Sequence, residues 1–431
     1  MPSRKRAQVV QESRNHHNTQ RIPPLPLEVW HEIFQHLAGE PKKWLASVST
    51  ICKTLHPEVE AVLYRTVVIR TCVRVGAPFC RSVVRRPHRA IAVRELDIQV
   101  HGSVSLVGPL ARAFKAVTNL RALTLFGDES LLRLLLDVPF QLQKLNLGCC
   151  EEEYTPDFVK DVLARQPTIR ELGLYLRMRS DASLICSNKT PSEKEDKFLL
   201  SRADILPHLR ILDVMVNFFP LARITAPYAV THLSFGRAHR DDVAHAVQLF
   251  GEQLVALKIT RCIDTSCTDR CFWPTSVFSH TQRLPRLRYL EIQEDSEFDV
   301  DLNPGEVTIP PRESFPAIKT LMWIPSCRQE VLDYLDDPEN NEKDPPSLFS
   351  YACALFQRWP TLETFALCDE LELSALRMKL PGEPPDPGES IGVCDKAAPV
   401  ARGFRRGEEG SVVGLMTMEF AQEGWRRYTS S

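Results

Sequence analysis

The chain has 431 residues, of which 43% are hydrophobic and 25% charged, the proportions of an ordinary globular protein. Its 53 basic and 55 acidic residues leave a net charge of -2, which excludes a global positive field that would draw it onto nucleic acid or an anionic membrane. Residues 1–21 lack the apolar core of a secretory signal, and no apolar run is long enough to span a bilayer. We therefore expect a cytoplasmic or nuclear protein with reduced cysteines and without membrane or nucleic-acid partners.

Residues 1–21 are polar and basic, and we expect a disordered leader there. The following segment, residues 22–66, has the apolar spacing of short amphipathic helices. Pro26 suits a first helical turn, and Gly39 and Pro41 separate two apolar stripes. The stripes are Val29, Ile33, Phe34 and Leu37, followed by Trp44, Leu45, Val48 and Cys52.

This segment resembles the F-box motif, and its ending, from Leu63 to Val67, is similar to that of fungal members. It departs from the pattern at Leu55, where many members have Trp. The resemblance implies an all-α module that docks onto the Skp-type adaptor of a cullin–RING ubiquitin ligase. The implied adaptor-binding residues are Leu25, Pro26, Val29, Ile33, Leu37, Leu45, Val48 and Leu55. The alternative is that these helices only cap the repeats that follow, because repeat proteins need terminal caps.

From Ala92 onward one unit recurs, in which apolar residues are separated by two residues and then by one. Ten copies lie between 21 and 44 residues apart, centred on Leu96, Leu123, Leu145, Leu172, Leu212, Leu233, Leu257, Leu290, Leu321 and Phe365. Helical stripes precede several copies, in residues 131–136, 158–163 and 243–250. Leucine-rich repeats have a similar spacing of about 20–29 residues. The pattern predicts a short strand and a return helix in each unit, in an irregular leucine-rich-repeat-like solenoid over residues 67–380. An ordinary leucine-rich α/β domain is the alternative.

Four polar segments interrupt the pattern, and we expect surface loops at residues 177–197, 295–316 and 336–346. The fourth begins a C-terminal region, residues 381–431, that we expect to be largely disordered. Val412, Val413 and neighbouring apolar residues either close the repeats or form only a sticky tail.

No nucleotide-binding, zinc-protease or serine-hydrolase motif occurs, so we expect no enzyme and no cofactor. Cys262, Cys267, Cys271 and His280 have part of a zinc spacing but no second ordered pair, and we expect no metal there. A basic run in residues 81–94 is expected to be the solvated face of a helix, with Phe79, Cys80, Val83 and Val84 inside.

The periodicity predicts an α/β chain, in which the resemblance implies a short all-α F-box ahead of the repeat region. The function that the resemblance implies is that of a substrate-recognition adaptor of a ubiquitin ligase, which binds a Skp-type adaptor, through it a cullin, and an unidentified target protein. The alternative is a repeat scaffold without a ligase role. The two differ in whether the stripe Leu25, Val29, Ile33 and Leu37 is free or buried against Val67 and Ile69. No short motif identifies the substrate-binding residues.

Overall fold

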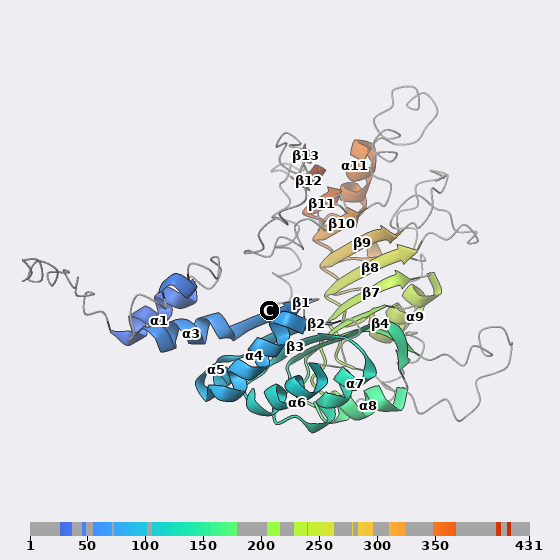
Figure 1. Cartoon of the computed structure of the whole chain (residues 1–431). Coiled ribbons are helices and arrows are strands. Elements are labelled where there is room, and N and C mark those ends of the chain that lie inside the picture. The colour runs from blue at the N-terminus through green and yellow to red at the C-terminus, as the bar shows by residue number, and fades with distance from the viewer. Residues whose placement is uncertain are drawn as a thin grey trace, which may run out of the picture. The chain divides into compact units, whose positions relative to one another are not determined.

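The computed structural model divides the chain into two compact units, Met1–Leu63 and Tyr64–Ser431. The structure describes residues 26–36, 45–48, 55–70, 73–100, 106–154, 156–178, 205–215, 228–238, 240–262, 278, 283–295, 310–324, 348–367, 402–406 and 412–414. Figure 1 shows the course of the chain. Each unit is described by itself.

The N-terminal unit is helical where it is described. Helix α1 (Leu27–His36) begins after Pro26, whose carbonyl accepts from the amide of Val29 at 3.1 Å. Residues 45–48 are helical, and α3 (His56–Arg65) begins with Pro57 in its first turn and crosses the boundary between the units. A small core joins them: Phe34, Leu45, Leu55, Val59 and Val62, with Trp30, Val48 and Leu63 packed against it. We call these residues the N-terminal core.

The second unit contains one sheet in which eleven parallel strands follow one another in chain order. They are β1 (Thr66–Arg70), β2 (Glu95–Gln99), β3 (Ala122–Phe126), β4 (Lys144–Tyr154), β5 (Glu171–Met178), β6 (Ile211–Met215), β7 (His232–Ala238), β8 (Ala256–Cys262), β9 (Tyr289–Asp295), β10 (Thr320–Ile324) and β11 (Thr364–Leu367). All ten predicted strands are present, and β1 was not predicted. The parallel pairing of consecutive strands confirms the α/β class.

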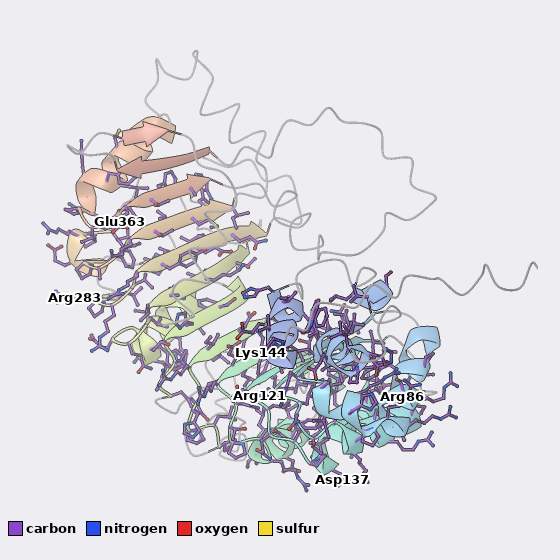
Figure 2. All side chains as sticks on the ribbon, turned by 90° about the vertical axis from the view of Figure 1, so that its left-hand side faces the viewer. Arg86, Arg121, Asp137, Lys144, Arg283 and Glu363 are labelled. Atoms are coloured by element: carbon purple, nitrogen blue, oxygen red, sulfur yellow. The ribbon has the colours of Figure 1, made fainter. Side chains whose placement is uncertain are left out.

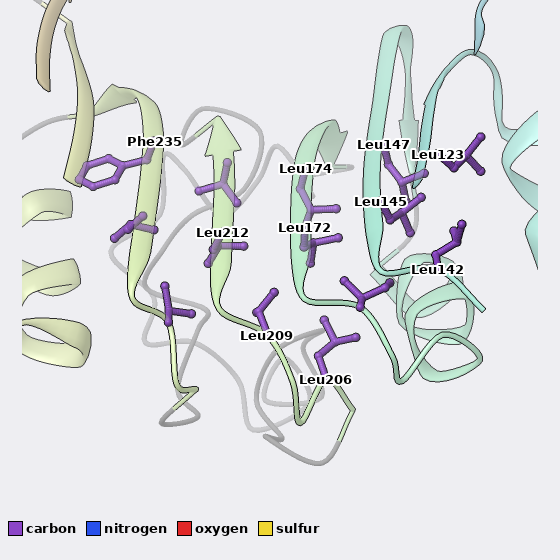
Figure 3. Close-up of a cluster of buried hydrophobic side chains, with 14 of the residues drawn as sticks. Leu123, Leu142, Leu145, Leu147, Leu172, Leu174, Leu206, Leu209, Leu212 and Phe235 are labelled. Atoms are coloured by element: carbon purple, nitrogen blue, oxygen red, sulfur yellow. The ribbon is translucent and has the colours of Figure 1, made fainter. Parts of the chain in front are cut away.

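Alternate residues of each strand face a continuous apolar core. In β3, Leu123 and Leu125 are buried, whereas the alternate residues Ala122, Thr124 and Phe126 are only half-buried. The register aligns equivalent residues on successive strands, so that Leu123 lies beside Leu145 and Leu145 beside Leu172. Figure 3 shows these leucine rows. Each repeat of the sheet therefore buries its apolar face against the next repeat.

Helices connect the strands and add their apolar faces to the same core. They are α4 (Val73–Arg85), α5 (Pro87–Ala92), α6 (Val107–Ala116), α7 (Glu129–Leu132), η3 (Arg133–Asp137), α8 (Pro156–Ala164), α9 (Arg240–Phe250), η7 (Arg312–Ser314) and α11 (Leu348–Arg358). The three helices predicted from sequence correspond to α7 with η3, α8 and α9. None of the helices in the described ranges has the length and apolar character to cross a membrane.

The predicted basic helix face is largely as expected. Phe79, Cys80 and Val83 of α4 are buried, and Arg81 and Arg85 are exposed. Burial raises the pKa of the Cys80 thiol from an ordinary 9.0 to about 11, so this cysteine acts as a small apolar side chain. The prediction was wrong for Val84, which is 45% exposed because it lies on the arginine side of the helix.

The C-terminal region departs from the prediction of a largely disordered tail. Two strands, β12 (Arg402–Arg406) and β13 (Val412–Gly414), continue the sheet in antiparallel orientation. An edge strand presents unpaired backbone groups, and β12 pairs with those of β11. Val412 and Val413 lie in β13, in agreement with the alternative that this stretch closes the repeats, and the rest of residues 381–431 lies outside the described ranges. The predicted loops fall mostly outside them as well.

Candidate functional site

Helix α1 carries two apolar stripes on adjacent sides. Trp30 and Phe34 form the inner stripe, since their rings stack at 5.8 Å and Phe34 is 1% exposed in the N-terminal core. Val29 and Ile33 are likewise one turn apart and form what we call the outer stripe. Val29 is 38% exposed and Ile33 is half-buried. A side chain as apolar as valine gains free energy when a partner covers it, so the outer stripe is a candidate docking surface.

The predicted adaptor-binding residues separate into two groups. Pro26 is exposed beside the outer stripe of Val29 and Ile33, whereas Leu45 and Leu55 are only 1% and 6% exposed. Since both leucines lie inside the N-terminal core, they support the module instead of presenting a surface. Val48 is partly buried against the same core.

Leu25 and Leu37 lie outside the described residues. Val67 and Ile69, which the cap alternative would place against the outer stripe, belong to the core of the sheet: Ile69 is buried in it, and Val67 packs against it.

A second candidate surface is the face of the sheet opposite the leucine rows, which we call the second face. It is formed by the first, third and fifth residues of the strands. The register aligns its middle row across all eleven parallel strands. This row contains Val68, Asp97, Thr124, Asn146, Gly173, Asp213, Ser234, Lys258, Glu291, Met322 and Ala366.

The second face is accessible at one end of the sheet and closed at the other. On β2 to β6 its side chains are half-buried or exposed. On β7 to β11 most of them are buried, among them His232, Tyr289, Glu291 and Met322. A partner that binds this face therefore meets β2 to β6.

Two aromatic side chains bridge three strands in the accessible half. Phe126 of β3 and Tyr175 of β5 stack with ring centroids 5.7 Å apart and planes 28° apart, although β4 runs between them. Gly148 of β4 makes this possible, because a Cβ at this position would overlap the ring of Phe126. The Tyr175 hydroxyl donates a hydrogen bond to the Asp213 carboxylate of β6. This hydrogen bond holds the Tyr175 ring of the stacked pair in place.

Carboxylates outnumber ammonium groups around this bridge. Within β2 to β6 the second face carries Glu95, Asp97, Glu171 and Asp213 against the single lysine Lys144. Lys144 pairs with Glu171 at 3.0 Å, and Asp97 accepts from the Gln99 amide at 3.2 Å. The surface therefore combines flat aromatic faces with an excess of negative charge, a combination that suits a segment bearing Lys or Arg.

Sequence reasoning left the target-binding residues unassigned. Their positions follow from the strand pattern, because second-face residues alternate with the leucines. The bridge does not follow from that pattern, since it depends on the pairing of Phe126 beside Gly148 and on the side-chain direction of Tyr175. Hydrophobic periodicity carries no information on either.

The described residues contain no group of three or more His, Cys, Asp or Glu side chains arranged to hold a metal ion. Of the weak zinc pattern, Cys267, Cys271 and His280 lie outside those residues, as does the side chain of Cys262.

A comparison of the sequence with known protein families finds no match, and a search of curated proteins finds no significant match.

Proposed function

We propose that the chain is a substrate-recognition adaptor of a Skp–cullin–F-box ubiquitin ligase. The N-terminal unit is its F-box and binds a Skp-type adaptor, and through it a cullin. The second unit is an irregular leucine-rich-repeat-like solenoid that holds a target protein. In this assignment the chain has no catalytic residues of its own and presents the target for ubiquitin transfer.

The division of α1 into two stripes is the observation that carries the proposal. A helix that only capped a repeat array would need one apolar side, directed at its neighbours. In α1, Trp30 and Phe34 already supply the side that packs in the N-terminal core, yet Val29 adds apolar area at the surface. An outer stripe on a short helix fits recognition by insertion into an apolar groove of a partner.

The repeat assignment is supported by the strict chain order of the parallel strands and by the alignment of equivalent residues. Non-catalytic repeat proteins commonly bind other proteins along such extended surfaces. We assign target binding to the second face of β2 to β6, around Phe126 and Tyr175.

The test is a titration of purified Skp adaptor into the full chain and into the double variant Val29→Asp/Ile33→Lys. Burying unpaired charge in a groove costs several kcal/mol, and each 1.4 kcal/mol is a factor of ten in affinity. We therefore expect adaptor affinity to fall at least about 100-fold, with an unchanged circular dichroism spectrum and melting temperature. The matched control is Val84→Asp/Ile91→Lys, which makes the same substitutions at two exposed apolar residues of α4 and α5. It should bind like wild type.

Wild-type affinity in a well-folded Val29→Asp/Ile33→Lys variant would contradict the docking surface. Absence of any complex with wild-type protein, together with a lower melting temperature of the whole variant chain, would favour the alternative of a repeat scaffold with a terminal cap.

A further inference from the structure

A backbone ladder runs along the edge of the sheet at which the parallel strands begin. The residue immediately before each strand donates its amide to the carbonyl of the equivalent residue one strand earlier. These hydrogen bonds measure 2.7–2.9 Å over the whole series. The series is Arg65, Arg94, Arg121, Gln143, Arg170, Arg210, Thr231, Val255, Arg288, Lys319 and Glu363. We call it the edge ladder; Figure 2 labels two of its members, Arg121 and Glu363.

The first six positions of the edge ladder hold five arginines and one glutamine. Four of these arginines are exposed, and Arg94 is half-buried. Such a concentration contrasts with the net charge of -2 for the chain. Hydrogen bonds fix the backbone at each position, so the points from which these arginine side chains extend are held at a regular interval by the sheet.

Among the described residues, the arginines at the centre of this region have no competing partner. In the described part of the chain, the side chains of Arg121, Arg170 and Arg210 make no hydrogen bond or salt bridge. Their acidic neighbours in sequence are engaged elsewhere: Glu171, which follows Arg170, pairs with Lys144 at 3.0 Å, and Asp213, three residues after Arg210, accepts a hydrogen bond from the Tyr175 hydroxyl. At the far end of the ladder, Lys319 pairs with Glu363 at 2.6 Å, which neutralises that end.

The spacing indicates the shape of the partner. Neighbouring strands lie about 4.8 Å apart, so the first six positions span about 24 Å. An extended polypeptide rises about 3.3 Å per residue and covers this length with about eight residues. Guanidinium groups match the geometry of carboxylates with two parallel hydrogen bonds. Single-stranded nucleic acid fits less well, because its binding surfaces stack bases on aromatic side chains and no ladder position is aromatic.

We propose that the edge ladder of β1 to β6 binds an extended acidic segment of a partner protein. The surface is distinct from the second face, whose excess charge is negative, and from the outer stripe of α1. Its occupancy does not depend on adaptor binding, so failure of one proposal is distinguishable from failure of the other.

The test measures fluorescence anisotropy of labelled eight-residue peptides with the full chain at low ionic strength. One peptide carries Glu at alternate positions, and its analogue carries Gln there. We expect the Glu peptide to bind more tightly than the analogue and its affinity to fall as salt is added. The variant Arg121→Glu/Arg170→Glu/Arg210→Glu should weaken its binding by about tenfold or more.

The control variant, Arg81→Glu/Arg85→Glu/Arg112→Glu, makes the same change in net charge at exposed arginines of α4 and α6. Compared with wild type at about 0.15 M salt, where the Debye length is about 8 Å, it should change the affinity by less than about twofold, because screening then confines the effect of charges outside the edge ladder. Should the ladder variant fail to fold, the corresponding triple change to Gln should also weaken binding well beyond the control. The proposal is overturned by absence of binding to the Glu peptide, by equal losses in ladder and control variants, or by tighter binding of an eight-nucleotide oligouridylate.

Discussion

Two lysine–glutamate pairs have the same chemistry but differ in how deeply their side chains are buried. Lys258 of β8 approaches Glu291 of β9 to 2.5 Å, with side chains 18% and 7% exposed. The Tyr289 hydroxyl also donates to Glu291, at 2.8 Å. Lys319 and Glu363 are equally close but 41% and 60% exposed. Buried charges depend on their partners far more than exposed charges do.

We therefore predict that Lys258→Met lowers the free energy of unfolding by about 3 kcal/mol, because the buried carboxylate of Glu291 loses this ammonium. Lys319→Met should cost less than about 1 kcal/mol. Adding Glu291→Gln to Lys258→Met should recover more than half of the loss, since the amide is neutral and still accepts from Tyr289. Urea unfolding measures all three, and equal costs for the two single variants would contradict the difference in burial.

The glycine beneath the aromatic bridge allows a second test at the residue scale. Gly148→Ala should displace the ring of Phe126 and remove its stack on Tyr175, at a cost of about 0.5–1.5 kcal/mol in stability. Gly108→Ala is the control, because a Cβ there meets nothing within 4 Å and an alanine in α6 should stabilise the helix by up to about 1 kcal/mol. Thermal unfolding should therefore shift in opposite directions for the two variants; a shift in the same direction would argue against the bridge.

Among the elements, the strands that belong to the repeat pattern can be predicted from the sequence, whereas elements without that pattern are missed. Ten strands are predicted because each places large apolar residues at fixed offsets, including β10 and β11, in which Trp323 and Phe365 take the place of leucines. β1 is missed although Tyr64, Val67 and Ile69 have the offsets of the repeat, because the stretch from Leu63 to Val67 resembles the ending of the F-box motif. The two stripes of α1 merged into one prediction, since Val29, Ile33 and Phe34 all fit the helical period, and only packing assigns Phe34 to the core.

The C-terminal hairpin of β12 and β13 does not follow from the sequence, because the residues before it are polar and predict disorder. Its role is to pair with the edge of β11, and the register sets Phe404 of β12 opposite Phe365 of β11. This pairing depends on residues distant in the sequence, and local composition does not encode it.

Deletion of residues 400–431 should consequently expose the backbone groups of β11. We predict a lower melting temperature and association that increases with protein concentration, as unpaired edges promote. Deletion of residues 416–431 keeps β12 and β13 and serves as the control. Light scattering and differential scanning fluorimetry distinguish the two, and identical behaviour of both deletions would contradict a structural role for the hairpin.

In the whole molecule, the three proposed binding surfaces belong to two units. The N-terminal unit carries the outer stripe, and the sheet carries the second face and the edge ladder. These surfaces share no residue, and changes at sites without shared partners usually add in their energetic effects. Adaptor binding should therefore be insensitive to the ladder variant, and peptide binding insensitive to Val29→Asp/Ile33→Lys.

Hydrogen–deuterium exchange of the full chain, with and without the Skp adaptor, reports whether α1 is the docking surface. The small N-terminal core should allow α1 to open locally in the free chain, and a bound partner should suppress that opening. We predict slower exchange in Leu27–His36 on addition of the adaptor, with unchanged exchange in β2 to β11. Protection confined to the strands of the sheet, or a complex that leaves α1 unchanged, would contradict the assignment of this helix as the docking surface.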